Sequence, residues 1–316
     1  MLACLVVNVL LAAPAITLPG GPPVAIDYTA YDAAHHRVWI PAGNTGNVDV
    51  IDDATRQVTA IGGFPTRPSP RPGRPPMGPS SVAVAGDTVW VGNRADEKIC
   101  SLDARTLARG PCVQIHEMPD GLAWVGATRE LWITTPRIHA LTILDGRREV
   151  ASLPLAGEPE GYAVDDAAGR FYTNLEDQDR TLVIDVHTRK ILATWSPGCG
   201  EAGPRGLALD AGRQLLFVAC TDGAVALDGR SGKVLGRLHT GGGVDNLDYL
   251  PGKSLLVVAA SRTATLTVAR AGAAGSLEPV AVLRTAPGAR NPAVDGKGVA
   301  YLPDSPEGKL LVVPLP

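Results

Sequence analysis

The sequence is poor in the patterns that indicate a helical or a nucleic-acid-binding protein. No stretch of the 316 residues sustains apolar spacing at i, i+3, i+4 and i+7, and the 36 Gly and 27 Pro disfavour long helices. Only 19% of the residues are charged and the formal net charge is −3, so there is no basic face to match nucleic-acid phosphates. We therefore expect almost no helix and no nucleic-acid partner.

Motifs of the common catalytic and metal sites are also missing. The sequence contains no GxSxG or HExxH motif, and no glycine-rich phosphate loop that leads into a helix. The six His do not recur at one position of a repeat, which disfavours a histidine metal cage. The absence of CxxC and CxxCH spacing disfavours thiolate metal sites and c-type haem. These absences favour a binding protein over an enzyme, with the enzyme kept as the alternative.

What the sequence does contain is a repeated unit of four short strands. The clearest copy spans residues 158–195, where four apolar runs are separated by Gly, Asp, Asn and Thr. The second run of each unit carries one aromatic or large apolar residue, at spacings of 51, 42, 39, 46, 40 and 44 residues. These residues are Trp39, Trp90, Trp132, Phe171, Phe217, Val257 and Tyr301. Seven units of this length predict an all-β, seven-bladed β-propeller of four-stranded antiparallel blades.

Two further features support this architecture. The third strand of five units ends in an Asp, which can accept hydrogen bonds from the backbone of the following turn. These residues are Asp52, Asp103, Asp145, Asp185 and Asp228. The last unit lacks a fourth strand, because the chain ends soon after the run 310–313. Since an unpaired edge is a liability, we expect residues 15–18 or 24–26 to supply the missing strand and close the ring.

The N-terminal segment resembles a secretory leader. Residues 2–15 are apolar and end in Ala13-Pro14-Ala15, a small-x-small cleavage pattern, so we expect residues 1–15 to be a signal peptide. Residues 16–316 would then form a single propeller domain with no membrane span in the mature chain. A basic n-region is missing, because no Lys or Arg precedes Arg37. A hydrophobic first strand is therefore the alternative.

The cysteines fall into local pairs. Cys100 and Cys112 flank a hairpin loop, and Cys199 and Cys220 belong to two loops at one face of a single unit. An even number of paired cysteines suits an oxidising compartment, so we expect two disulfides and a periplasmic or secreted protein. Buried free thiols are the alternative.

One run connects the repeat to a known family. Phe171-Tyr172-Thr173-Asn174, followed by Val183-Ile184-Asp185, resembles the YVTN repeat of the YncE-like seven-bladed propellers. The resemblance covers nearly the whole chain after the leader. It implies an extracytoplasmic binding or scaffold protein without a shared catalytic motif. The sixth unit departs most, because Leu256-Val257-Val258-Ala259 lacks the aromatic residue and the Asn.

Propeller geometry gathers one set of polar residues at one end of the central channel. The loops between blades and those after each second strand share this face. The residue ten to twelve positions before each second-strand marker forms a polar column: Asp27, Ser80, Asp120, Glu160, Arg205, Asp245 and Arg290. The next column is Tyr28, Ser81, Gly121, Gly161, Gly206, Asn246 and Asn291, where we expect structural turns because Gly and Asn tolerate left-handed backbone.

We expect a ligand site at this channel mouth. The predicted ligand-binding residues are Asp27, Arg94, Asp120, Glu160, Arg205, Asp245, Asn246, Arg290 and Asn291. The alternative is that each charge only solvates its own loop. Arg205 and Arg290 favour a ligand with a carboxylate or phosphate group, which Arg binds bidentately.

The carboxylates also raise the possibility of a hard cation such as Ca²⁺, which takes several oxygen ligands. The predicted metal ligands are Glu160, Asn174, Asp222 and Asp245. We therefore expect a monomeric, extracytoplasmic protein that binds a small polar ligand, an ion or a protein partner at the channel face. The alternative functions are a Ca²⁺-dependent lactonase- or lyase-like enzyme and a structural surface-layer module.

Overall fold

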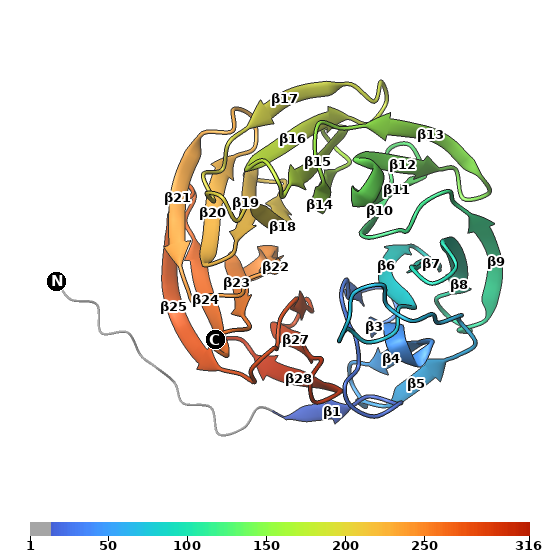
Figure 1. Ribbon diagram of the computed structural model, residues 1–316. Coiled ribbons are helices and arrows are strands. Elements are labelled where there is room, and N and C mark those ends of the chain that lie inside the picture. Colours follow the sequence, from blue (N-terminus) through green and yellow to red (C-terminus); the bar gives the residue numbers. More distant parts are fainter. Residues whose placement is uncertain (1–13) are drawn as a thin grey trace.

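The computed structural model describes residues 14–316, which form a ring of seven antiparallel four-stranded sheets (Figure 1). Each sheet is one blade, with its first strand nearest the centre of the ring and its fourth strand at the rim. The predicted all-β seven-bladed propeller is confirmed. Residues 1–13 of the predicted signal peptide lie outside the described residues, so the leader stays a prediction.

The first four blades follow one another along the chain. Blade 1 comprises β2 (Ala30–Asp32), β3 (Arg37–Ala42), β4 (Asn47–Asp52) and β5 (Val58–Ile61). Blade 2 comprises β6 (Pro79–Ala85), β7 (Thr88–Asn93), β8 (Lys98–Asp103) and β9 (Arg109–Gln114). Blade 3 comprises β10 (Leu122–Val125), β11 (Glu130–Thr135), β12 (Ala140–Leu144) and β13 (Glu149–Pro154). Blade 4 comprises β14 (Pro159–Asp165), β15 (Arg170–Leu175), β16 (Arg180–Asp185) and β17 (Ile191–Trp195).

The last three blades complete the ring. Blade 5 comprises β18 (Pro204–Asp210), β19 (Leu215–Cys220), β20 (Gly223–Asp228) and β21 (Val234–His239). Blade 6 comprises β22 (Leu247–Leu250), β23 (Leu255–Ala260), β24 (Thr265–Ala271) and β25 (Leu277–Arg284). Blade 7 comprises β26 (Ala293–Val294), β27 (Val299–Asp304), β28 (Lys309–Pro314) and β1 (Ala15–Thr17). Helix in the described residues is confined to three 3₁₀ turns, η1 (Gly43–Thr45), η2 (Pro136–Ile138) and η3 (Pro251–Lys253).

The core consists of apolar layers between neighbouring blades. Every second-strand residue predicted from the repeat is buried. Trp132 of blade 3 lies against Phe171 of blade 4, with ring centroids 4.9 Å apart. Phe217 of blade 5 lies against Tyr249 of blade 6 at 4.8 Å. The recurrence of one large side chain per unit therefore reflects the need to fill the wedge between adjacent sheets.

The Asp residues at the ends of the third strands form the predicted turns. In each of the five units, one carboxylate oxygen accepts the backbone N–H groups two and three residues later. Asp185, for example, accepts from His187 at 3.1 Å and from Thr188 at 2.7 Å. These bonds stabilise the charged carboxylate and lower the pKa of Asp185.

The two ends of the described chain share blade 7. β1 pairs antiparallel with β28, with Ile16 opposite Leu310, so the first strand in sequence completes the last blade (Figure 1). Leu18 and Val24, which follow β1, are buried in the apolar cluster between blades 7 and 1. The predicted closure of the ring by the N-terminal strand is confirmed.

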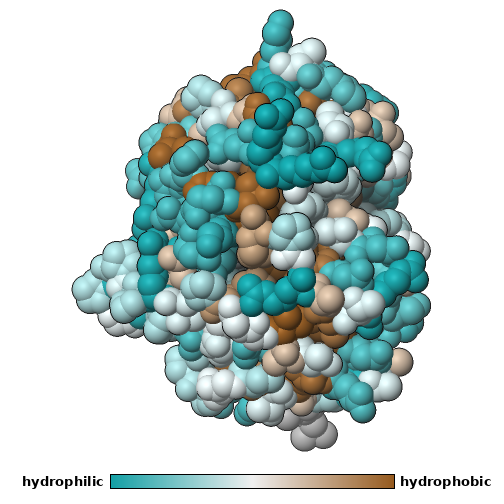
Figure 2. Space-filling model, turned by 90° about the vertical axis from the view of Figure 1, so that its right-hand side faces the viewer, coloured by the Kyte–Doolittle hydropathy of each residue, from teal (hydrophilic) through white to brown (hydrophobic). Residues whose placement is uncertain are grey.

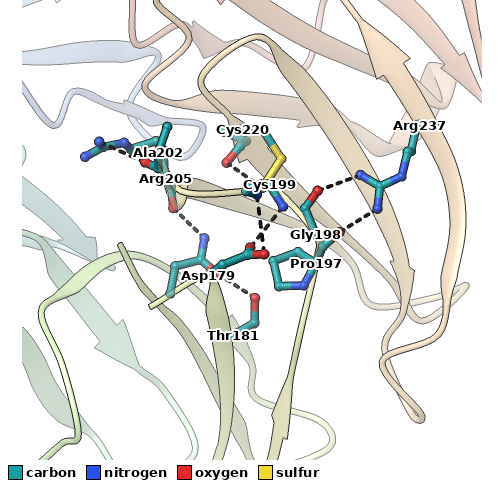
Figure 3. Close-up of a disulfide and its surroundings, with 12 residues drawn as sticks. Asp179, Thr181, Pro197, Gly198, Cys199, Ala202, Arg205, Cys220 and Arg237 are labelled. Carbon is teal, nitrogen blue, oxygen red and sulfur yellow. Dashed lines mark hydrogen bonds between the residues drawn. A yellow bond between two sulfur atoms is a disulfide. The ribbon is translucent and has the colours of Figure 1, made fainter. Parts of the chain in front are cut away.

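Both predicted disulfides are present. Cys100 and Cys112 lie opposite each other on β8 and β9, and their bond attaches a rim strand whose own side chains are mostly exposed. Cys199 and Cys220 join the loop between blades 4 and 5 to the end of β19 (Figure 3). Asp179 holds the same loop by accepting the backbone N–H of Cys199 at 2.9 Å.

The rim of the ring is mostly hydrophilic. Figure 2 shows the side that carries β9 and β13 in Figure 1, where teal and white residues predominate around a central band of brown ones. The large hydrophobic residues that are exposed among residues 14–316 are Ile138, Ile191, Leu192 and Val280, on η2, β17 and β25. A few exposed hydrophobic side chains, spread over three elements, are normal at a protein surface.

One buried carboxyl breaks the apolar pattern. Asp49, in the middle of β4, is fully buried, and neither of its carboxyl oxygens has a hydrogen-bond partner. Its register partner Ile40 belongs to the cluster between blades 7 and 1, so Asp49 lies on the same apolar face. Burial raises the pKa of Asp49 to about 7.

The first prediction concerns closure of the ring. A variant that begins at Pro19 lacks β1 and Leu18, whereas a variant that begins at Pro14 retains both. Because β28 loses its partner strand, we expect the shorter variant to melt at least about 5 °C below the longer one. Thermal unfolding followed by circular dichroism measures this, and equal melting temperatures would contradict closure by β1.

The second prediction follows from the raised pKa of Asp49. Between the unfolded pKa near 3.8 and the folded pKa of about 7, the folded state keeps a proton that the unfolded state has lost. Stability therefore falls as pH rises through this window, and Asn, which does not titrate, removes that loss. Between pH 5 and pH 8, the unfolding free energy of the unaltered protein should fall by about 2 kcal/mol relative to that of Asp49→Asn.

Urea unfolding at the two pH values tests this, with Asp52→Asn as the control on the same strand. The turn at Thr55 lowers the pKa of Asp52, so this carboxylate stays charged in both states between pH 5 and pH 8. The control should show a constant difference from the unaltered protein. The same constant difference for Asp49→Asn would show that Asp49 does not titrate in this range.

Candidate ligand site at the channel mouth

Polar residues from six blades converge where the inner strands begin. We call them the mouth cluster: Asp27, Tyr28, Arg94, Asp120, Glu160, Asp245, Arg290 and Asn291. Most lie at or just before the first residue of an inner strand, whereas Arg94 follows β7. Because every inner strand starts at the same end of the ring, the repeat places these residues around one opening.

Arg94 joins two of the carboxylates. Its guanidinium donates to Asp27 of blade 1 at 2.8 Å and forms an ion pair with Asp120 of blade 3. Burial alone would lower the pKa of Arg94, but Asp120 and Asp27 outweigh burial and raise it. Burial raises the pKa of Asp120, and Arg94 opposes that rise. The guanidinium therefore links blades 1, 2 and 3 across the mouth.

Tyr28 crosses from blade 1 to the opposite side of the cluster. Its hydroxyl lies 3.3 Å from Glu160 Oε1 and 3.4 Å from Asp120 Oδ2, so its single proton can be donated to either carboxyl group. Its ring stacks on Tyr162 of blade 4, with centroids 5.9 Å apart and planes 22° from parallel. Burial raises the pKa of Tyr28 well above its ordinary value, and Glu160 adds to the rise. The hydroxyl consequently keeps its proton at neutral pH.

The remaining members form a second group next to the first. Arg290 pairs with Asp245 at 3.2 Å, which joins blades 7 and 6. Asn291 donates from its amide to the backbone and side-chain oxygens of Asp27, both at 3.3 Å. Burial lowers the pKa of Arg290 and Asp245 raises it, with a net upward shift.

Glu160 differs from the other three carboxylates of the cluster. Asp27 and Asp120 share Arg94, and Asp245 has Arg290, but within residues 14–316 Glu160 forms no ion pair within 4 Å. Burial and the carboxylates of Asp120 and Asp245 raise the pKa of Glu160 well above its ordinary value. Of the four carboxylates at the mouth, Glu160 is therefore the one whose charged form an added positive charge would stabilise most.

Two predicted ligand residues lie outside the cluster. Arg205 forms its ion pair with Glu176, from the turn after β15, and donates to the backbone oxygen of Ala202 at 3.2 Å (Figure 3). Asn246 accepts the backbone N–H of Leu247 at 2.9 Å. Tyr28 is the member that sequence analysis placed among structural turns, and nothing local in the sequence indicates how far its side chain reaches.

The second column of the repeat is structural, but for a different reason than expected. Gly121, Gly161 and Gly206 do not have left-handed backbone; they are sites of close approach. A Cβ atom on Gly161 would lie 2.5 Å from the carbonyl oxygen of Arg205. Glycine there lets neighbouring inner strands approach at the axis. Asn291 does have the expected left-handed conformation, with φ of 57°.

One of the four residues predicted to bind calcium is engaged within its own sheet and the next blade. Asn174 is fully buried, and its amide donates to the backbone oxygen of Arg205 and accepts from Thr181. Its carbonyl is therefore directed into the sheet. Within residues 14–316 no three His, Cys, Asp or Glu side chains are arranged to hold a metal ion. The four predicted ligands Glu160, Asn174, Asp222 and Asp245 are not brought together as a calcium site.

Comparisons with known proteins identify the fold. No family model and no curated protein matches the sequence. A chain of a mitotic checkpoint complex structure superposes with a TM-score of 0.79 at 13% identity, covering 95% of this chain and 91% of that one. Virginiamycin B lyase from Staphylococcus aureus gives 0.75 at 11%, covering 96% and 99%. The WD40 propeller domain of Doa1 gives 0.72 at 14%, covering 94% of each chain. Identities this low establish the propeller fold alone.

The third prediction tests the ion pairs of the mouth cluster. Arg94→Met leaves Asp27 and Asp120 without their shared cation. Breaking buried pairs typically costs about 3–5 kcal/mol, and because Arg94 is 22% exposed we expect about 2–3 kcal/mol. Arg205→Met breaks one pair of similar exposure, that with Glu176, where Arg94→Met breaks two, so it should cost about half as much. Urea unfolding at pH 7 measures both, and equal losses would show that the cluster is no more than an exposed set of charges.

Proposed function

We propose that this protein is an extracytoplasmic binding protein whose mouth cluster takes a small polar ligand bearing a positively charged group. The proposal rests on the environment of Glu160. It is a partly buried carboxyl at the channel mouth, its pKa is raised, and no cation among the described residues pairs with it. An ammonium or guanidinium group from a ligand would supply the missing charge.

The charge balance of the cluster supports a cation rather than an anion. Four carboxylates face two guanidiniums, and both guanidiniums already have carboxylate partners. Arg205, which favoured an anionic ligand on sequence grounds, has Glu176 as its partner instead. A carboxylate or phosphate ligand would have to displace an existing ion pair before an Arg could bind it.

The compartment and the family are part of the same proposal. Two disulfides are consistent with an oxidising, periplasmic or secreted location. Among the described residues no helix is long and apolar enough to cross a membrane. The propeller fold suits a binding or interaction scaffold, and the YVTN-like run of β15 supports a relationship to the YncE-like propellers. We propose a monomer, since one chain closes the whole ring.

We do not propose a Ca²⁺-dependent enzymatic activity for this protein. A lactonase- or lyase-like centre built from Glu160, Asn174, Asp222 and Asp245 would need the side chain of Asn174 free, and its amide is engaged within the protein. The likeness to virginiamycin B lyase is at 11% identity and supports the fold only.

The fourth prediction uses agmatine, a small molecule with an ammonium and a guanidinium group. Because the pKa of Glu160 is raised, a cation that binds beside it favours the charged carboxylate and releases a proton. Calorimetric titrations across about pH 6–7.5 should therefore give heats that differ between phosphate and ACES, which both buffer this range and differ in ionisation enthalpy. Glu160→Gln should abolish this difference and weaken binding at least about tenfold, or about 1.4 kcal/mol.

The matched control is Glu176→Gln, which removes a carboxylate outside the cluster and should leave agmatine binding unchanged. Succinate, a dianion of similar size, should not bind. Unaltered agmatine affinity in Glu160→Gln, or tighter binding of succinate than of agmatine, would refute a cation site at the mouth.

A further inference from the structure

A proline-rich segment connects β5 to β6, and the function proposed above does not use it. We call residues 65–77 the arm; they read Pro-Thr-Arg-Pro-Ser-Pro-Arg-Pro-Gly-Arg-Pro-Pro-Met. The arm contains six Pro and three Arg, and no Asp or Glu occurs between Asp53 and Asp87. Because the net charge of the whole protein is −3, the arm is a local concentration of positive charge on an acidic protein.

The base of the arm is fixed to the ring. Arg67 and Met77 form a backbone bridge, with N···O distances of 2.8 and 3.0 Å. The backbone oxygen of Pro65 accepts the side-chain amide of Asn93, in blade 2, at 3.1 Å. Arg67 also pairs with Glu97, in the turn after β7, at 3.5 Å. The arm therefore leaves the ring at a defined place between blades 1 and 2.

The tip of the arm carries two arginines next to each other. Pro72 and Gly73 form a turn, in which the backbone N–H of Arg74 donates to the oxygen of Arg71 at 3.3 Å and Gly73 has φ of 74°. Pro-Gly is usual at the centre of a type II turn, which brings its first and fourth Cα atoms within about 7 Å of each other. Both arginines are exposed, and within residues 14–316 neither forms an ion pair within 4 Å.

The prolines limit how a partner can bind to the arm. Pro has no backbone N–H, so the arm offers few donors to an added β-strand. Its exposed pyrrolidine rings are apolar and rigid, and ordering them on binding costs little conformational entropy. Recognition of the arm therefore depends on its Arg side chains and on contacts between proline and aromatic rings, as in other proline-rich segments.

We propose that the arm is a docking element for an extended, acidic segment of a partner protein. The carboxylates of this segment pair with Arg71 and Arg74, and its aromatic side chains pack on the prolines. Arg binds carboxylate bidentately and also stacks on aromatic rings, so the tip suits both kinds of side chain. The arm does not include Glu160, and its role does not depend on the ligand proposed for the mouth cluster.

Two observations favour a protein segment over a membrane or a long polyanion. The tip consists of Arg, Pro and Gly, so it has no large apolar side chain to enter a lipid bilayer. The net negative charge of the whole protein opposes its approach to an extended anionic surface or polymer. A discrete acidic segment, in contrast, needs to contact only the arm.

The fifth prediction uses the fluorescein-labelled octapeptide Glu-Glu-Tyr-Glu-Glu-Tyr-Glu-Glu and a twin in which every Glu is Gln. Fluorescence anisotropy with the full propeller at low salt should show the acidic peptide binding at least about tenfold more tightly than its twin, with the difference shrinking as salt is added. Arg71→Ser/Arg74→Ser should remove this preference. A third peptide, with Ser in place of Tyr, should bind more weakly than the acidic peptide because it lacks the aromatic rings.

The matched control is Arg137→Ser/Arg262→Ser. It removes two exposed arginines from turns that follow other second strands, so it changes the net charge equally and should keep the preference. Circular dichroism establishes that each variant is folded. An equal loss in both double variants, or equal binding of the acidic peptide and its Gln twin to the unaltered protein, would overturn the proposal.

Vesicles of phosphatidylglycerol and heparin test the other classes of partner. Binding of either one that requires Arg71 and Arg74, without binding of the acidic peptide, would overturn the proposal in favour of a lipid or a polyanion. Equal affinity for the peptides with Tyr and with Ser would refute the contact between prolines and aromatic rings. Failure of agmatine to bind bears only on the mouth cluster.

Discussion

The pairing of β1 with β28 is the constraint on which the rest of the structure depends. The first strand of the chain completes the last blade, so one stretch of chain belongs to blade 7 and leads directly into blade 1. Closure brings blade 1 against blade 7, where Asn291 contacts Asp27 although the two are 264 residues apart. It also seals the apolar cluster of Leu18 and Val24. The channel and its mouth have defined shapes because the ring is closed.

The parts of the structure that could be predicted from the sequence are those that repetition makes redundant. A side chain such as Trp132 recurs once per unit because each wedge between blades needs one large residue. Asp185 and its equivalents mark turns through bonds to the backbone two and three residues ahead, which is a local interaction. The disulfide partners Cys100 and Cys112 are near in sequence and face each other across one hairpin. In each case one local pattern fixes one local structure.

The directions of long side chains at the mouth could not be predicted in the same way. Repetition places the Cα atoms of Arg205 and Glu160 at equivalent positions, but it does not determine which neighbour each side chain meets. Arg205 turns to Glu176, and Arg94 reaches from blade 2 to both adjacent blades. Tyr28 crosses the axis to blade 4. These contacts join separate units, and no pattern within one unit encodes them.

A buried carboxyl group can either only reduce stability or also bind a ligand, and access from solvent distinguishes the two cases. Asp49 and Glu160 both have raised pKa values and lack a cation partner among the described residues. Unpaired carboxyl groups reduce stability, so their presence calls for either compensation or use. Asp49 is sealed between β-strands with 0% exposure, where no ligand can reach it. Glu160 is instead partly exposed at the mouth of the channel. Both groups have raised pKa values, so it is the difference in access that distinguishes them. A ligand can reach Glu160 at the channel mouth, whereas Asp49 in β4 only lowers the stability of the fold.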